Sequence, residues 1–178
     1  VPAADAASSF TTGTAAVTAD QPGPDGTANK AFTVTDSSGA AQQGLQRNQT
    51  VSADSVTRAA SIFVKKASSA QSTLPGIQIG YAGGTAISGA VTLDAFTVQM
   101  YATTGTPSGW TVEDAGTFWK VTRAVANNGT NTTFYLAFYP VYAAAASPGN
   151  GVSSQTGSWV CAWGNMRALD MPAPTILT

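Results

Sequence analysis

The sequence predicts an all-β protein folded as an antiparallel β-sandwich, and three observations support this prediction. No stretch longer than a turn or two shows the apolar spacing that an amphipathic helix requires. Short runs of alternating apolar residues recur along the chain, and clusters of Gly, Ser, Asn and Asp separate them. The composition is poor in charge, at 10%, and includes 18 Gly and 9 Pro, which favours strands and turns over helices.

Six alternating segments are the clearest strand candidates. They are 57–66, 76–84, 94–102, 116–128, 133–140 and 157–165. The turn between the fourth and fifth segments predicts that these two form a β-hairpin. Turns recur about every eight to twelve residues, which indicates seven or more strands and is typical of a sandwich or barrel.

Alternation within these segments predicts which side chains share a face. Ile77, Ile79 and Tyr81 alternate with polar or small residues, and Trp159, Cys161 and Trp163 also share one face. The 94–102 segment is expected to be one continuous strand, with Phe96, Val98 and Met100 on one side and Gln99 and Tyr101 on the other. In 116–128, Phe118 and Lys120 are expected opposite Trp119, Val121 and Arg123.

The fifth segment, TFYLAFYP, is apolar or aromatic on both faces. One face carries Phe134, Leu136 and Phe138 and is expected to be core, while the other carries Tyr135 and Tyr139. Pro140 is expected to end this strand or to lie on a sheet edge, because proline cannot donate to a β-ladder. The following residues, 143–156, are expected to form a long loop.

Charge and composition exclude several classes of partner. Net charge is −1, and Lys65-Lys66 is the one adjacent basic pair, so the basic footprint of a nucleic-acid-binding protein is missing. No apolar run approaches the length of a membrane-spanning helix, so we expect no membrane insertion. The single cysteine, Cys161, is expected to be a small buried apolar residue.

The inventory of reactive side chains argues against an enzyme. The chain has no histidine, which removes the commonest general base, and its one glutamate is Glu113. A usual structural zinc site is excluded, since there is neither a histidine nor a cysteine pair. No cofactor is expected, although calcium remains open as a structural ion, with Asp25 and Asp170 as its candidate ligands.

Five short motifs occur in an order that resembles a known family. They are PDGTANKAF (24–32), SIFVKKAS (61–68), GTFWKVT (116–122), FYP (138–140) and AWGNMRALDMPAPTILT (162–178). Their order and spacing resemble those of the jelly-roll, carbohydrate-binding-module-like domains of bacteriophage structural proteins. The resemblance covers 10–178, so we expect a linker or N-terminal arm at 1–9 and a single jelly-roll domain from 10 to 178.

The resemblance implies a fold, a location and a function. The fold would be a concanavalin-like or carbohydrate-binding-module-like jelly roll, and the protein would lie on the virion surface as part of a tail fibre, spike or head fibre. It would bind a host-surface polysaccharide or other glycan without catalysis, and it would form a homo-oligomer, with a trimer favoured. The alternative is a structural capsid-decoration or oligomerisation domain with no sugar ligand, which packs against itself or other virion proteins.

The candidate glycan site combines aromatic rings with polar side chains on the strands beside them. Its residues are Tyr101, Trp119, Tyr135, Tyr139, Gln99, Lys120 and Arg123. An aromatic ring can stack on the C–H face of a sugar, while amide and charged groups meet its hydroxyl rim. The competing explanations for these rings are packing in the core and packing between subunits.

Overall fold

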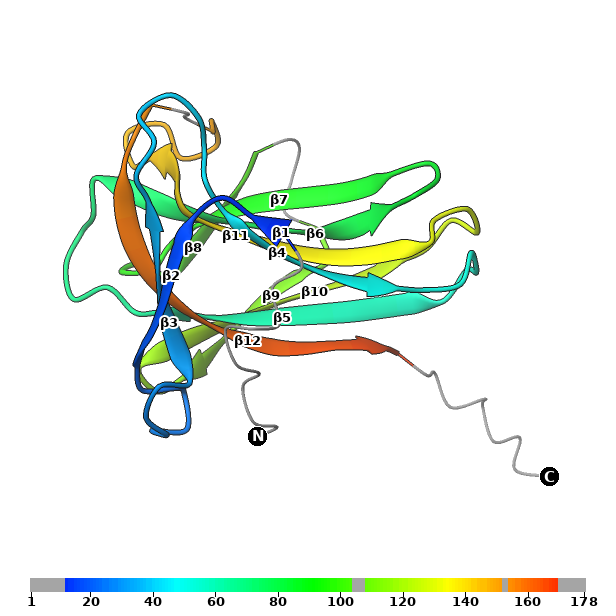
Figure 1. Ribbon diagram of the computed structural model, residues 1–178, viewed down its shortest axis with the longest axis horizontal. Coiled ribbons are helices and arrows are strands. Elements are labelled where there is room, and N and C mark those ends of the chain that lie inside the picture. Colours follow the sequence, from blue (N-terminus) through cyan, green and yellow to red (C-terminus); the bar gives the residue numbers. More distant parts are fainter. Residues whose placement is uncertain (1–11, 104–107, 152–153, 170–178) are drawn as a thin grey trace.

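The computed structural model describes residues 12–103, 108–151 and 154–169, which form twelve β-strands arranged in two layers (Figure 1). Every pairing between the strands is antiparallel, so the expected antiparallel β-sandwich is confirmed. Within these described residues there is no helix, and therefore none that could cross a membrane.

Each layer is a six-stranded sheet. Sheet A has the order β1 (Thr12–Gly13), β4 (Leu45–Thr50), β11 (Thr133–Ala144), β6 (Thr73–Ala82), β7 (Ile87–Asp94), β8 (Gln99–Ala102). Sheet B has the order β2 (Ala16–Gln21), β3 (Ala31–Asp36), β12 (Gly157–Ala168), β5 (Thr57–Lys65), β10 (Phe118–Ala126), β9 (Trp110–Ala115).

The connections between the sheets follow the order of a jelly roll. Strands β3, β4, β5 and β6 alternate between sheets B and A, and β10, β11 and β12 alternate again. The late strands β11 and β12 each insert between two early strands, β11 between β4 and β6, and β12 between β3 and β5. Two interleaved Greek keys of this kind define the eight-stranded jelly roll, to which β1, β2, β8 and β9 add short flanking strands.

The core lies between the two sheets and follows the predicted alternation. Sheet A contributes Phe134, Leu136 and Phe138 together with Ile77, Ile79 and Tyr81, all with 0% exposure. Sheet B faces them with Ala60, Ile62 and Val64 of β5 and with Cys161 and Trp163 of β12. The buried Tyr81 hydroxyl donates to the carbonyl oxygens of Val56 and Val125, which satisfies its polar end.

The hairpin predicted between 116–128 and 133–140 is wrong. Strand β10 pairs with β5 and β9 in sheet B, whereas β11 pairs with β4 and β6 in sheet A. The connection crosses from one sheet to the other, and two buried amides hold it. The Asn127 side chain donates to the Asn131 carbonyl oxygen at 2.8 Å, and the Asn131 side chain donates to the Thr85 carbonyl oxygen at 2.9 Å.

The continuous strand predicted at 94–102 is also wrong. Only β8, Gln99–Ala102, is a strand, and the residues before it form the turn that returns from β7. The Asp94 carboxylate accepts from the backbone N–H groups of Phe96 and Thr97, and Val98 has a φ of 60°. This turn leaves Phe96 and Val98 48% and 40% exposed, so they do not belong to the core.

Pro140 does not end its strand, which continues to Ala144. It lies just beyond the last pair with β4, Phe138↔Leu45, and at an irregularity where the register with β6 jumps from Tyr139 to Ala143. A bulge of this kind tolerates the missing proline N–H. It also reverses the alternation of β11, because Val141 and Ala143 are buried beyond it whereas Tyr142 is only partly buried.

Candidate functional site

The outer face of sheet A brings together tyrosine and amide side chains from four strands, β4, β6, β8 and β11. Register places Tyr135 of β11 beside Gly80 of β6, which lies beside Ser88 of β7. A second row runs from Tyr139 through Gly76 and Thr92 to Tyr101 of β8, with Gln99 next to Tyr101 on the same face. We call this surface the tyrosine face and define it by Tyr101, Tyr135, Tyr139, Tyr142, Gln46, Asn48, Gln78 and Gln99.

The tyrosine rings of β11 pack on glycines of the neighbouring strands. A Cβ atom added to Gly44 would lie 2.6 Å from Tyr139 Cδ1, and one added to Gly76 would lie 2.3 Å from Tyr142 Cγ. Tyr135 lies opposite Gly80 of β6, which in turn lies opposite Ser88 of β7.

Two hydroxyl groups of this face, those of Tyr135 and Tyr139, have pKa values raised by their surroundings. Burial raises the pKa of Tyr135, although the Arg123 guanidinium partly offsets this, and burial also raises the pKa of Tyr139. Each hydroxyl therefore keeps its proton and can both donate and accept a hydrogen bond. At the edge of the face, the Tyr101 hydroxyl donates to Gln99 Oε1 at 2.9 Å, which fixes the ring.

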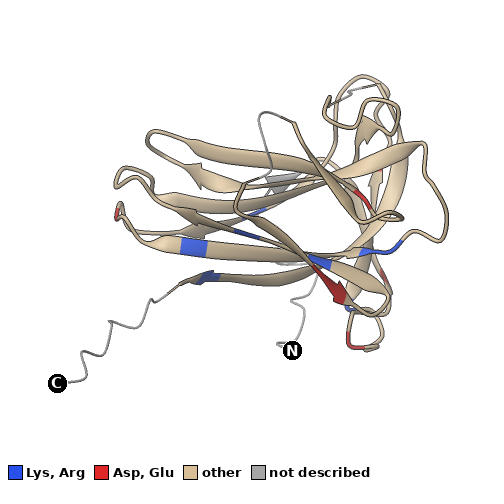
Figure 2. Cartoon of the chain, turned by 180° about the vertical axis from the view of Figure 1, so that it is seen from behind, with Lys and Arg blue, Asp and Glu red and all other residues tan. Residues whose placement is uncertain are grey.

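The tyrosine face is poor in charge. No charged residue is among those that define it, but Asp94 of β7 pairs with Gln99 at its β8 edge, where its carboxylate accepts from the backbone N–H groups of Phe96 and Thr97. On sheet B, by contrast, the outer face carries Lys65, Lys120, Glu113 and Arg167. Figure 2 shows that the charged residues lie mainly on the strands of one layer and on loops. A surface of tyrosine and amide groups with little charge suits a ligand that offers hydroxyl groups and apolar faces.

The segment after β11 closes one end of the tyrosine face. It passes over β7, where the Thr92 hydroxyl donates to the Pro148 carbonyl oxygen, and the Ala145 N–H donates to the Ser72 carbonyl oxygen at 2.9 Å. Part of the segment predicted as a loop, residues 152 and 153, lies outside the described residues. The face is thus a platform bounded at one end by this segment.

The structure divides the seven predicted glycan residues between three places. Tyr135, Tyr139, Tyr101 and Gln99 lie together on the tyrosine face. Lys120 lies on the outer face of sheet B, where its ammonium group is 3.0 Å from Glu113 Oε2. The remaining two, Trp119 and Arg123, are on the inner side of β10, so the seven residues do not form one site.

Trp119 and Arg123 join the two sheets rather than facing solvent. The Trp119 indole N–H donates to the Ala95 carbonyl oxygen at 2.8 Å, beyond the end of β7. The Arg123 guanidinium donates to the Ile79 carbonyl oxygen of β6. The Cζ atom of this guanidinium occupies the space that a Cβ on Gly89 would need. Both side chains are therefore structural contacts between the layers.

Tyr142 was missed by the sequence prediction. Uninterrupted alternation from Phe138 would place it in the core, and only the bulge at Pro140 brings it to the outer face. Its ring centroid lies 5.3 Å from that of Tyr139, at an angle of 55°. A proline inside a strand was the one signal in the sequence that could have indicated this reversal.

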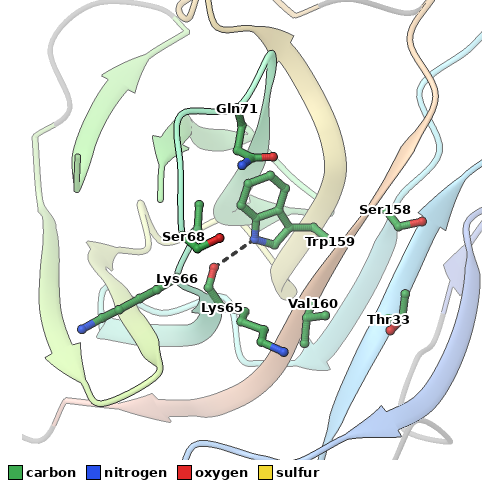
Figure 3. Close-up of a pocket in the computed structure, with 9 residues that line it drawn as sticks. Thr33, Lys65, Lys66, Ser68, Gln71, Ser158, Trp159 and Val160 are labelled. Atoms are coloured by element: carbon green, nitrogen blue, oxygen red, sulfur yellow. Dashed lines mark hydrogen bonds between the residues drawn. The ribbon is translucent and has the colours of Figure 1, made fainter. Parts of the chain in front are cut away.

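A pocket on sheet B was also missed. Trp159 lines it with residues of β3, the end of β5 and the segment that follows β5, and its volume is about 260 Å³ (Figure 3). The indole N–H donates to the Lys65 carbonyl oxygen at 3.1 Å. The expectation that Trp159 shares a face with the buried Cys161 and Trp163 holds, but only part of its ring is covered by the core.

Of the two candidate calcium ligands, Asp25 lies among the described residues. The Asp25 carboxylate accepts from the Thr27 backbone N–H at 3.0 Å, as expected for a residue in a turn, and this bond lowers its pKa. Asp170 lies outside the described residues. In the described ranges, no three acidic, histidine or cysteine side chains gather into a group that could hold a metal ion.

Comparison with known proteins adds no family to this description. No protein-family model matches the chain, and no curated protein matches it.

Proposed function

We propose that this domain binds a neutral glycan on the tyrosine face and that it does so without catalysis. The observation that carries the proposal is the close packing of Tyr139 against Gly44 and of Tyr142 against Gly76, which holds aromatic side chains on the outer face of sheet A among amide groups. A pyranose ring has a C–H face that stacks on such a ring. Gln78 of β6 and Gln99 of β8 lie on the same face and supply amide groups that can meet the sugar hydroxyls.

The proposed place of action is the surface of a virus particle. This part rests on the resemblance of the motifs at 24–32, 61–68 and 116–122 to domains of bacteriophage fibres and spikes. A platform of aromatic rings on rigid strands suits a polymer such as a host-surface polysaccharide, because an extended chain can touch several rings at once. If each copy of the domain binds weakly, the presence of many copies on one virus particle would raise the overall avidity for the polysaccharide.

A structural role is the second candidate, and the low charge of the tyrosine face favours it too. Surfaces that associate permanently are depleted of charge in their centre and enriched in aromatic residues. A second copy of the chain could cover Tyr135 and Tyr139 as well as a glycan could. The two proposals predict different effects of tyrosine substitution. The glycan proposal predicts a loss of polysaccharide binding with the mass of the protein in solution unchanged, and the structural proposal predicts dissociation of an oligomer.

Retention of the purified chain on immobilised neutral polysaccharides, such as dextran, mannan and galactan, tests the proposal. Removing a ring that stacks on sugar costs about 0.5–1.5 kcal/mol beyond lost area, so Tyr101→Ala or Tyr135→Ala should weaken retention about tenfold. Lys120→Ala, on the outer face of the other sheet, is the matched control and should retain full binding.

Light scattering on the same samples separates the two candidates. A chain that binds polysaccharide and keeps its mass in the tyrosine variants supports the glycan proposal. A chain that binds none of these polysaccharides, and whose oligomer dissociates in Tyr135→Ala, contradicts it and favours the structural role.

A further inference from the structure

The pocket beside Trp159 arises because two neighbouring strands of sheet B differ in length. Strand β5 ends at Lys65, whereas β12 continues beyond Cys161 toward Gly157 and there pairs only with β3. The chain after Lys65 turns away through Ala67, Ser68 and Gln71 instead of continuing the sheet. A hollow is left on the side of β12 from which β5 has departed.

Trp159 provides an apolar wall for this hollow. Its ring packs partly against the core, and its N–H is already used by the Lys65 carbonyl oxygen. The ring is thereby fixed, and what it offers a ligand is carbon surface. Figure 3 shows Gln71 and Ser68 beside the ring, with Ser158, Val160 and Thr33 on the other side of the pocket.

The pocket has the size of one sugar ring. Its volume of about 260 Å³ lies just below the range of about 300–1,000 Å³ that holds drug-sized ligands. Its lining includes three hydroxyl-bearing residues, Thr33, Ser68 and Ser158, and one amide side chain, Gln71. A fixed aromatic ring beside short polar side chains is a suitable environment for a carbohydrate, whose faces are apolar and whose rim is hydroxylated.

The two adjacent lysines of the pocket differ in their partners. The charge of Lys66 is already paired, because its ammonium group lies 2.7 Å from Asp114 Oδ1 and 3.9 Å from the centroid of the Trp119 ring. Lys65 donates instead to the neutral Gln21 Oε1 at 3.0 Å, which uses one of its three N–H groups. In Figure 3 the Lys65 ammonium points toward Val160 and Thr33, whereas that of Lys66 points away from Trp159.

The nearby carboxylate of Asp20 is engaged by the protein itself. Its Oδ1 accepts from the Thr33 hydroxyl at 2.7 Å and from the Thr33 N–H at 3.3 Å, which lowers the pKa of Asp20. Lys65 therefore brings a positive charge to the pocket that neither Asp20 nor Asp114 pairs with directly. A ligand carboxylate beside Lys65 would accept hydrogen bonds from the two remaining N–H groups of the Lys65 ammonium.

We propose that this pocket binds a single carboxylate-bearing sugar residue, such as a uronic acid within a polysaccharide. The sugar ring lies against Trp159, its hydroxyl groups meet Gln71 and Ser68, and its carboxylate meets the Lys65 ammonium. The site lies on sheet B and is separate from the tyrosine face of sheet A, so it does not depend on the function proposed above.

Titration calorimetry of the full chain with tetragalacturonate, and with the same oligomer after reduction of its carboxyl groups, tests this site. The two probes share their rings and linkages and differ in charge alone. Wild-type chain should bind the acidic oligomer about tenfold or more tightly than the reduced one, as a hydrogen bond to a charged group implies. That preference should shrink as salt is added.

Neighbouring residues supply the matched variants. Lys65→Met should abolish the preference for the acidic oligomer, Lys65→Arg should restore most of it, and Lys66→Met should leave it within about twofold. Trp159→Phe should weaken binding of the acidic oligomer, and Tyr135→Ala should leave the affinity for the acidic oligomer unchanged, because Tyr135 lies on the other sheet. Thermal melting of each variant establishes that it is folded before its affinity is compared.

Three results would overturn the proposal. They are equal affinity of the wild-type chain for both oligomers, no binding of either, or equal loss of preference in Lys65→Met and Lys66→Met. Because none of them involves the tyrosine face, failure here leaves the neutral-glycan proposal standing, and failure of that proposal leaves this one standing.

Discussion

The packing of Tyr142 on Gly76 gives a direct test of how the tyrosine face is built. A Cβ added at Gly76 would lie 2.3 Å from Cγ, 2.5 Å from Cβ and 2.6 Å from Cδ2 of Tyr142. Carbon atoms pack best at about 3.5–4.0 Å, so Gly76→Ala creates an overlap of more than about 1 Å. The overlap is with the root of the side chain, which cannot swing away without moving the backbone of β11.

The cost of this substitution can be worked out from two opposing effects. Overpacking of this kind typically costs about 1–3 kcal/mol, while replacing glycine by alanine stabilises by about 0.4–1 kcal/mol through the unfolded chain. Gly76→Ala should therefore lower the free energy of unfolding by about 1–2 kcal/mol. In a Tyr142→Gly background the Cβ, Cγ and Cδ2 atoms are all removed and the overlap is gone, so the same substitution should be neutral or stabilising by up to about 1 kcal/mol.

Urea unfolding followed by tryptophan fluorescence measures all four members of this cycle. The expected coupling between the two positions is about 2 kcal/mol, well above the scatter of independent sites. Gly39→Ala is the control, because a Cβ there has no atom within 4 Å, and it should not destabilise the protein. If Gly76→Ala costs the same with and without the Tyr142 ring, the ring does not lie on the glycine and the description of the platform is incorrect.

Two further predictions concern the fold. Tyr81→Phe removes a buried hydroxyl that donates to two carbonyl oxygens, so it should lower the free energy of unfolding in urea by about 0.5–1.5 kcal/mol. The hydrogen bonds of Arg58 lower the pKa of Asp54 from 3.8 to about 2, so their stabilisation is fully present above about pH 4 and is lost as the pH falls toward 2. Melting temperatures of wild type and Asp54→Asn should therefore converge between pH 4 and pH 2, and a constant difference would contradict this origin of the stability.

Alternation with a period of two allowed much of the fold to be predicted. It placed Ile77, Ile79 and Tyr81 on the buried side of their strand, and it separated the phenylalanines of β11 from Tyr135 and Tyr139. Alternation does not predict which strands pair with each other. In a jelly roll, consecutive segments often belong to opposite sheets, so the short turn after β10 was wrongly interpreted as a hairpin.

The candidate site was predicted only in part for the same reason. Tyr101 and Tyr135 could be assigned to an outer face from their neighbours, but Trp119 and Arg123 could not be distinguished from outward residues without the pairing of β10. A single bulge at Pro140 reversed the orientation of Tyr142. The Trp159 pocket forms because β5 ends at Lys65, while the start of β12, from Gly157, extends past that point. The residue pattern within either strand does not predict this difference in length.

The most direct test of the central claim uses the five tyrosines of the chain as reporters. Four of them, Tyr101, Tyr135, Tyr139 and Tyr142, belong to the tyrosine face, while Tyr81 has 0% exposure and serves as an internal reference. NMR spectra of tyrosine-labelled protein are recorded during titration with the neutral polysaccharide that retains the chain best. The account predicts that the ring signals of the four surface tyrosines shift and that the Tyr81 signal does not. Unchanged signals from all four during saturable binding would contradict it.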